Sequence, residues 1–161
     1  MKHFIKLSSF VFLLAGSFAS CDLLSDLQNS SSKLTFKVTV NQKDTILFTG
    51  DAIKYYNDST HEVVFADSLK IPNEIAFSKL KCYLAGDSLF TATMTSDYMS
   101  ATVNELVLYH NLHTDRYYFE DGYPVNYDYL PAKNLREQNK LKRADAWAKF
   151  IAQLKIEERY K

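Results

Sequence analysis

The 161-residue sequence predicts an α+β fold, with an antiparallel β-meander of about seven or eight strands and one amphipathic C-terminal helix packed on a sheet face. Two observations predict it. Through residues 33–120 apolar and polar residues alternate with period two, as they do in half-buried strands. After Pro131 the apolar residues instead recur every three or four positions, as they do on one face of a helix.

Turn-forming residues divide the alternating region into four predicted hairpins, which span residues 33–48, 52–66, 78–95 and 105–119. The chain has only 4 glycines, so most turns are expected to use Asn, Asp and Ser, whose side chains hydrogen-bond the nearby backbone. Hairpins that follow one another in this way predict a meander, one face of which can stay solvated.

The C-terminal helix is predicted over roughly residues 138–157. Its expected main anchor is Trp147, within an apolar stripe formed by Ala144, Trp147, Ala148, Ile151 and Leu154. Elsewhere in the domain, Cys82 shares an alternating face with Leu80 and Leu84. That position predicts a buried, inert thiol rather than a catalytic one, which needs an electropositive and partly open setting.

Three segments are expected along the chain: a signal peptide over residues 1–20, a tether over 21–32 and a single globular domain over 33–161. The apolar run of the first segment is shorter than the roughly 20 residues that a membrane-spanning helix needs. The tether is polar and has no apolar period, so it cannot bury enough surface to fold.

The residues Phe18-Ala19-Ser20-Cys21 resemble the lipobox of bacterial lipoproteins, in which an aliphatic residue and two small residues precede a cysteine. The chain resembles the small Bacteroidota-type lipoproteins of unknown function. This resemblance implies that Cys21 carries a lipid and anchors the protein to a membrane of the bacterial cell envelope, facing the periplasm or the cell surface. The alternative is an ordinary secretory signal that contains a chance cysteine.

The most distinctive segment is residues 117–131, which contains five tyrosines and one phenylalanine among acidic residues. A tyrosine ring offers a flat apolar face and a hydroxyl group, which suits sugar stacking or a protein interface. We therefore expect a non-enzymatic module that binds a glycan or an envelope protein. Its candidate ligand-binding residues are Tyr117, Tyr118, Tyr123, Tyr127, Tyr129, Glu120 and Asp121. Alternatively, these tyrosines only pack the connection between the last strand and the helix.

Two other functions remain open. An envelope glycan hydrolase would use a carboxylate pair, for which Glu120, Asp121 and Asp128 are the nearest candidates. A structural subunit of a surface assembly would use the basic helix face as its contact. No nucleotide-binding or serine-hydrolase motif is present, so no catalytic residue is assigned. His110 and His113, with Asp115 nearby, have metal-ligand spacing, but no further ligands are marked, and we predict no metal ion or cofactor.

Four Asp-(Ser/Thr) sequences resemble the O-glycosylation signal of exported Bacteroidota proteins. They fall at predicted turns, where a bulky sugar is tolerated. The resemblance implies modification at Thr45, Ser59, Ser68 and Ser88.

The neutral total charge, with 19 basic and 19 acidic residues, argues against nucleic acid as a partner. This total conceals an asymmetry. Residues 21–131 contain 8 basic and 15 acidic residues, whereas residues 132–161 contain 9 basic and 4 acidic ones. The sequence therefore predicts an acidic sheet and a basic C-terminal helix, which could attract each other or present a basic face to an anionic membrane or partner.

Overall fold

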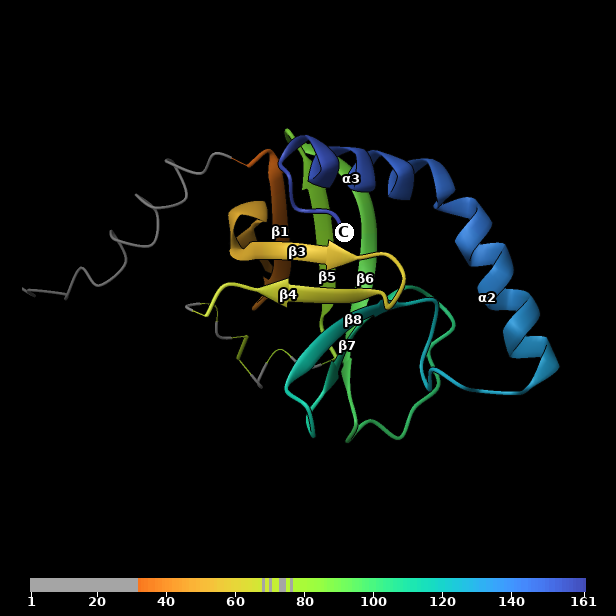
Figure 1. Cartoon of the computed structure of the whole chain (residues 1–161). Helices are drawn as coiled ribbons and strands as arrows, with labels where there is room; N and C mark the ends of the chain where they lie inside the picture. The colour runs from red at the N-terminus through yellow and green to blue at the C-terminus, as the bar shows by residue number, and fades with distance from the viewer. Residues whose placement is uncertain (1–31, 68, 70, 73–74, 76) are drawn as a thin grey trace, which may run out of the picture.

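The computed structural model describes residues 32–67, 69, 71–72, 75 and 77–161 (Figure 1). Within these residues the chain forms one eight-stranded sheet, followed by two helices, which confirms the α+β class. The sheet is mostly antiparallel. Its strands are β1 (Leu34–Val40), β2 (Lys43–Thr49), β3 (Ile53–Asn57), β4 (Glu62–Phe65), β5 (Lys79–Leu84), β6 (Asp87–Ser96), β7 (Val107–Asn111) and β8 (Arg116–Glu120). Cys21 and the tether up to residue 31 lie outside the described residues.

All four predicted hairpins form, but they do not follow one another across the sheet as a meander. The strand order is β2-β1-β5-β6-β7-β8-β4-β3, so the β3–β4 hairpin joins the far side and pairs with β8. In addition, β7 runs parallel to β6 because residues 97–106 carry the chain back before β7 begins. The period-two pattern fixes which side chains are buried, not which hairpins become neighbours.

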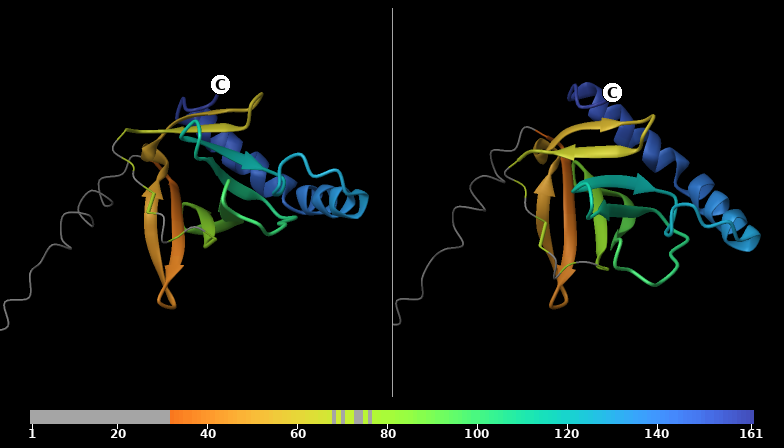
Figure 2. Two further views of the ribbon diagram at one scale, coloured as in Figure 1. Left: turned by 90° about the horizontal axis from the view of Figure 1, so that it is seen from below. Right: turned by 60° about the horizontal axis from the view of Figure 1, so that its bottom comes forward.

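The sheet curls around its inner face, which forms the core (Figure 2). A short 3-10 helix, η1 (Gly50–Ala52), connects β2 to β3, which are the two outer strands of the sheet. Rings from opposite ends of the strand order meet inside the curl, where Phe48 of β2 packs edge-on against Phe65 of β4 at 5.2 Å. Cys82 is fully buried in this core, and burial raises the pKa of its thiol. The prediction of a buried cysteine is confirmed.

The C-terminal region contains two helices, α2 (Leu130–Lys142) and α3 (Ala144–Ile156), instead of the single predicted one. They are separated at Arg143, where the backbone leaves the helical conformation. Pro131 lies in the first turn of α2, where its missing N–H costs nothing. Helix α3 lies across the sheet, whereas α2 extends away from it (Figure 1).

The buried anchor of α3 is Phe150, which the predicted stripe omitted, and Trp147 is only partly buried. The Phe150 ring lies 5.4 Å from Phe90 and 5.8 Å from Phe119, so it joins the helix to β6 and β8. Leu154, one helical turn further on, is also fully buried.

The residues after α3 cover the outer edge of β3. The Tyr56 amide donates to the Arg159 carbonyl at 2.8 Å, and the Lys161 amide donates to the Tyr56 carbonyl at 2.9 Å. These bonds satisfy backbone groups that an edge strand would otherwise expose.

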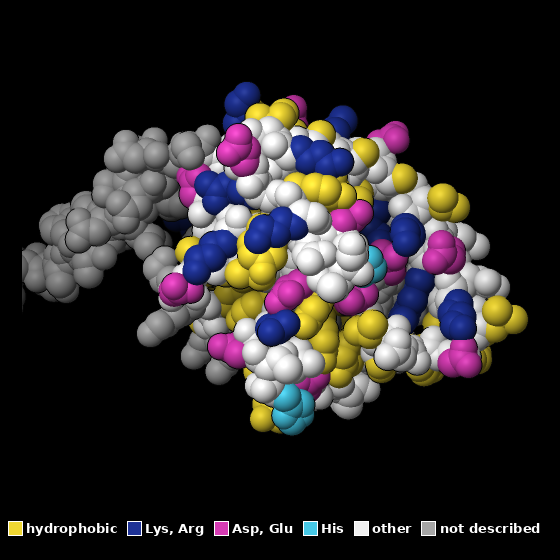
Figure 3. All heavy atoms as spheres, in the orientation of Figure 1, with side chains coloured by type: hydrophobic (Ala, Val, Ile, Leu, Met, Phe, Trp, Pro, Cys, Tyr) yellow, Lys and Arg dark blue, Asp and Glu magenta, His cyan; other side chains and the backbone are white. Residues whose placement is uncertain are grey.

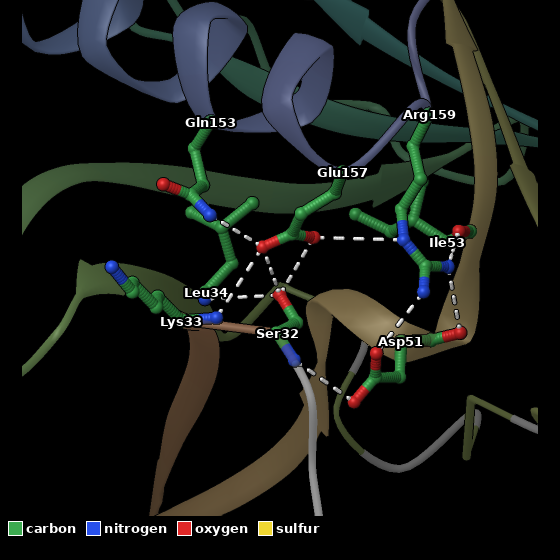
Figure 4. A network of polar contacts seen from close by, with 8 residues as sticks. All are labelled: Ser32, Lys33, Leu34, Asp51, Ile53, Gln153, Glu157 and Arg159. Atoms are coloured by element: carbon green, nitrogen blue, oxygen red, sulfur yellow. Dashed lines mark hydrogen bonds and ion pairs between the residues drawn. The ribbon is translucent and has the colours of Figure 1, made fainter.

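A polar network fastens the beginning of the described chain to the end of α3 (Figure 4). The Ser32 hydroxyl donates to the Glu157 carboxylate at 2.8 Å, and the Gln153 side-chain amide donates to it at 2.7 Å. The Ser32 amide and the Arg159 guanidinium both bond to the Asp51 carboxylate, at 3.2 and 3.0 Å. The first described residue is thereby held to both η1 and the C-terminal tail.

Candidate functional site

The seven candidate residues of segment 117–131 do not form a single patch. Tyr117 faces the inner side of the sheet, where its ring stacks on His110 at 4.1 Å and meets Phe65 at 5.2 Å. Its neighbour Tyr118 points to the opposite face because side chains alternate along a strand. Adjacent positions in a strand therefore separate two tyrosines that the sequence presents as a pair.

Tyr118 and Tyr123 pack around Tyr109 on the outer face, at ring distances of 6.1 and 5.7 Å. The Tyr109 hydroxyl donates to Asp97, and this bond lowers the pKa of the Asp97 carboxyl. The packing of Tyr118 and Tyr123 against Tyr109 is what the alternative interpretation expects, in which the tyrosines pack the connection between the last strand and the helix.

The other candidates lie near α2. Tyr127 and Tyr129 are on the crossover into that helix, with 37% and 57% of their surfaces exposed. Tyr127, Glu120 and Asp121 line one open cavity of about 630 Å³ between the end of β8, the crossover and α2. The other lining residues are Gly122, Val125, Asn126, Asp128, Lys133, Arg136 and Glu137. In the space-filling view, acidic and basic side chains intermingle over α2 and the neighbouring surface (Figure 3).

Two carboxylates of this cavity form ion pairs with neighbouring lysine and arginine side chains. Asp121 forms ion pairs with Arg143 and, at 3.0 Å, with Lys140. Asp128 pairs with Lys133, which holds the pKa of the Asp128 carboxyl below its usual range. The Asp128 carboxyl is therefore held in its ionised form at neutral pH, and the Asp121 carboxylate is engaged by two cations.

Glu120 differs from these carboxylates because its side chain is only 19% exposed. Burial raises the pKa of the Glu120 carboxyl, and the nearby His61 partly opposes that shift. The His61 Nδ1 atom lies 3.4 Å from a Glu120 oxygen. Burial therefore shifts the Glu120 carboxyl towards its protonated form.

Arg136 is a residue of the cavity that the sequence analysis missed. It is 7% exposed and joins α2 to two loops, donating to the carbonyls of Pro124 at 2.9 Å and Val103 at 3.4 Å. Its Nε atom donates to the Asn104 side chain at 3.3 Å. The signal was present, since Ala132, Arg136, Asn139 and Arg143 recur at helical spacing, but the predicted helix began too late to include it.

The remaining predicted sites lie elsewhere. His110 Nε2 lies 2.8 Å from an Asp115 oxygen, and His113 is exposed at the β7–β8 turn. The part of the chain that the structure describes contains no group of three His, Cys, Asp or Glu side chains arranged to hold a metal ion.

The three described glycosylation candidates are all exposed. Ser59 lies in a turn as predicted, whereas Thr45 and Ser88 lie within β2 and β6, beside their turns. Ser68 lies outside the described residues.

The fold and the cavity together define an α+β domain with a curled mixed sheet and a polar surface site beside a projecting helix. The chain matches no protein-family model, and comparisons with curated proteins and with solved structures likewise return no match. Among the described helices, none combines the length and the apolar character needed to cross a membrane.

Proposed function

We propose that this protein is a lipid-anchored, non-enzymatic binding module of the bacterial cell envelope, and that it binds a glycan in the cavity beside α2. The observation that carries the proposal is that the partly exposed ring of Tyr127 lines a cavity whose other walls carry hydrogen-bonding side chains. The lipid on Cys21 comes from the lipobox resemblance, and the site comes from the geometry of residues 120–137.

A sugar has the chemistry that this cavity complements. Its hydroxyl groups both donate and accept hydrogen bonds, and Asn126, Lys133 and Glu137 supply groups of both kinds around the cavity. Its C–H face packs on an aromatic ring, which Tyr127 provides. An apolar ligand would leave these polar groups without partners, so it fits the cavity less well.

The state of the carboxylates favours binding over hydrolysis. A glycosidase needs one protonated and one ionised carboxyl group beside the scissile bond. Of the predicted candidates, Glu120 has the environment of the first, whereas Asp121 and Asp128 are both held in ion pairs that a substrate would have to displace. The hydrolase remains the second candidate because of Glu120, and loss of glycan turnover in Glu120→Gln would support it.

The position of the cavity also suits an anchored receptor. The tether joins the domain at the start of β1, and α2 lies on the far side of the molecule from that point in every view (Figures 1 and 2). A cavity beside α2 would therefore lie away from the point at which the proposed tether enters the domain.

The test is a glycan array probed with the full chain and with Tyr127→Ala. We expect Tyr127→Ala to weaken binding roughly tenfold, because the stacking surface is lost. Tyr98→Ala is the matched control, since Tyr98 is an exposed tyrosine outside the cavity. Equal losses in both variants, or no loss in Tyr127→Ala, would reject the cavity as the site. Capture of an envelope protein with no glycan bound would favour the protein-binding alternative.

A further inference from the structure

Arg136 is a buried cation that has no acidic partner among the described residues. The other basic residues around the cavity face carboxylates, since Lys133 pairs with Asp128, and Lys140 and Arg143 pair with Asp121. Among the described residues, Arg136 contacts only neutral acceptors and the Tyr127 ring. A buried charge is costly unless an opposite charge compensates for it, so this position favours an incoming anion.

The guanidinium also has unused donors. An arginine carries five N–H groups, and the protein occupies three of them, one on each nitrogen. One N–H on Nη1 and one on Nη2 therefore remain for a ligand. Two N–H groups on the terminal nitrogens can be accepted together by the two oxygens of a carboxylate.

The surroundings hold this group in place at the cavity. The guanidinium passes directly over Gly122, where a Cβ atom would overlap its Nε and Cζ atoms and lie 2.7 Å from the Val103 carbonyl. The Tyr127 ring lies 5.7 Å from the Arg136 Cζ atom. The ring and the charge therefore lie side by side on the wall of the same cavity.

We propose that the ligand of this cavity carries a carboxylate, as an acidic sugar does, and that Arg136 binds that carboxylate. The inference rests on the proposed glycan-binding function and narrows it to uronate-type glycans. A carboxylate fits better than a phosphate group, because Glu120, Asp121, Asp128 and Glu137 also line the cavity and repel a double negative charge more strongly.

The competing explanation is that Arg136 only pins two loops to α2. Both explanations predict that substitution lowers stability. Only carboxylate binding predicts that Arg136 determines which sugar is preferred, so the test has to compare two ligands that differ in this group alone.

The experiment is calorimetric titration of the full chain with cellobiouronate and with its neutral counterpart cellobiose. We expect the uronate to bind at least about tenfold more tightly, and Arg136→Lys to lose roughly 10- to 100-fold of that affinity because the two-point contact is lost. Lys142→Gln is the matched control, because it removes one charge from an exposed position of the same helix, outside the cavity. It should retain the preference.

The outcomes separate the two proposals. Equal affinity for both sugars overturns the carboxylate proposal and leaves glycan binding standing. If neither disaccharide binds, the NMR signals of the Arg136 Nε–H and the Gly122 amide in the wild-type chain decide, with sodium glucuronate and glucose as probes. Shifts that occur with glucuronate alone support the proposal. Absence of shifts, or equal shifts with glucose, overturns it even if Arg136→Lys fails to fold.

Discussion

At the scale of single residues, the cavity beside α2 combines groups in opposite electrostatic situations. Arg136 is a buried positive charge, which an anionic ligand would compensate. Glu120 is a partly buried carboxyl group whose pKa is raised by burial, so its environment favours the protonated form. A carboxylate ligand bound near Arg136 would be repelled by an ionised Glu120. The substitution Glu120→Gln removes this charge and is therefore expected to help an anion bind. In a hydrolase, the same substitution would remove the catalytic acid.

Glu120 also predicts a pH dependence of stability. Its folded-state pKa is raised, so between the unfolded and folded pKa values the folded protein binds more protons than the unfolded chain. The free energy of unfolding contributed by Glu120 therefore falls as pH rises through that window. We therefore expect the difference in the free energy of unfolding between Glu120→Gln and the wild type to favour the variant more at pH 7 than at pH 4. Urea unfolding of both proteins at the two pH values measures this difference.

Asp128→Asn is the control, because the pKa of the Asp128 carboxyl is shifted in the opposite direction from that of Glu120. Lys133 lowers the pKa of the Asp128 carboxyl, so its contribution is present above the unfolded pKa and is lost as pH falls. Its substitution should therefore cost stability at pH 7 and not at low pH. The same pH dependence for both variants would contradict the assignment of Glu120.

At the scale of elements, α3 is held to the sheet mainly by Phe150. We expect Phe150→Ala to lower the free energy of unfolding by about 3 to 5 kcal/mol, because it opens a cavity among several aromatic rings. Ile156→Ala on the same helix is the control, since Ile156 is 75% exposed and should change stability by less than about 0.5 kcal/mol. Chemical denaturation of both variants checks this, and similar losses would show that Phe150 is not the anchor.

The elements also show how far the sequence could predict this molecule. The hairpins followed from local alternation and turn residues, because both depend on neighbours in the chain. The pairing of Val63 with Tyr117 did not, since any hairpin with a suitable edge could occupy that place. The division of the helix at Arg143 was also missed, because Leu130 and Leu135 are exposed and α2 has no apolar stripe to detect.

The candidate site was also predicted only in part, because the composition of a segment does not show which of its side chains meet in space. Segment 117–131 drew attention through its composition, but composition cannot say that Tyr117 and Tyr118 occupy opposite faces once β8 forms. Three of its seven residues line the cavity: Tyr127, Glu120 and Asp121. Helical spacing could have placed Arg136 on the inward face of α2, but its contacts with the Pro124 and Val103 carbonyls depend on loops that the spacing does not position.

At the scale of the whole molecule, the predicted charge asymmetry serves in part to join the two halves of the domain. Asp121, at the end of β8, pairs with Lys140 and Arg143 of the helical region, and Asp51 of η1 pairs with Arg159. The excess acidic charge of the sheet and the excess basic charge of the C-terminal region thus meet at specific contacts.

The network around Glu157 joins the beginning and the end of the domain and can be tested directly. We expect Glu157→Ala to cost about 1 to 3 kcal/mol, because Ser32 and Gln153 lose their shared acceptor. Glu158→Ala is the control, since the neighbouring Glu158 is exposed and its loss should change stability by less than about 0.5 kcal/mol. Thermal unfolding of both variants provides the measurement, and equal midpoints would show that the network adds no stability.

The position of the β3–β4 hairpin sets the order in which the domain can assemble. Residues 53–65 are made early, yet the strand beside β4 is β8 and the edge of β3 is covered by residues 159–161. Until those later segments arrive, both outer edges of the hairpin have open backbone groups. Pairings between such distant parts of a chain form slowly because a long loop must close first. The hairpin that completes the sheet is therefore among the first to be synthesised and the last to be secured, and this interval is when the chain is most exposed to mispairing.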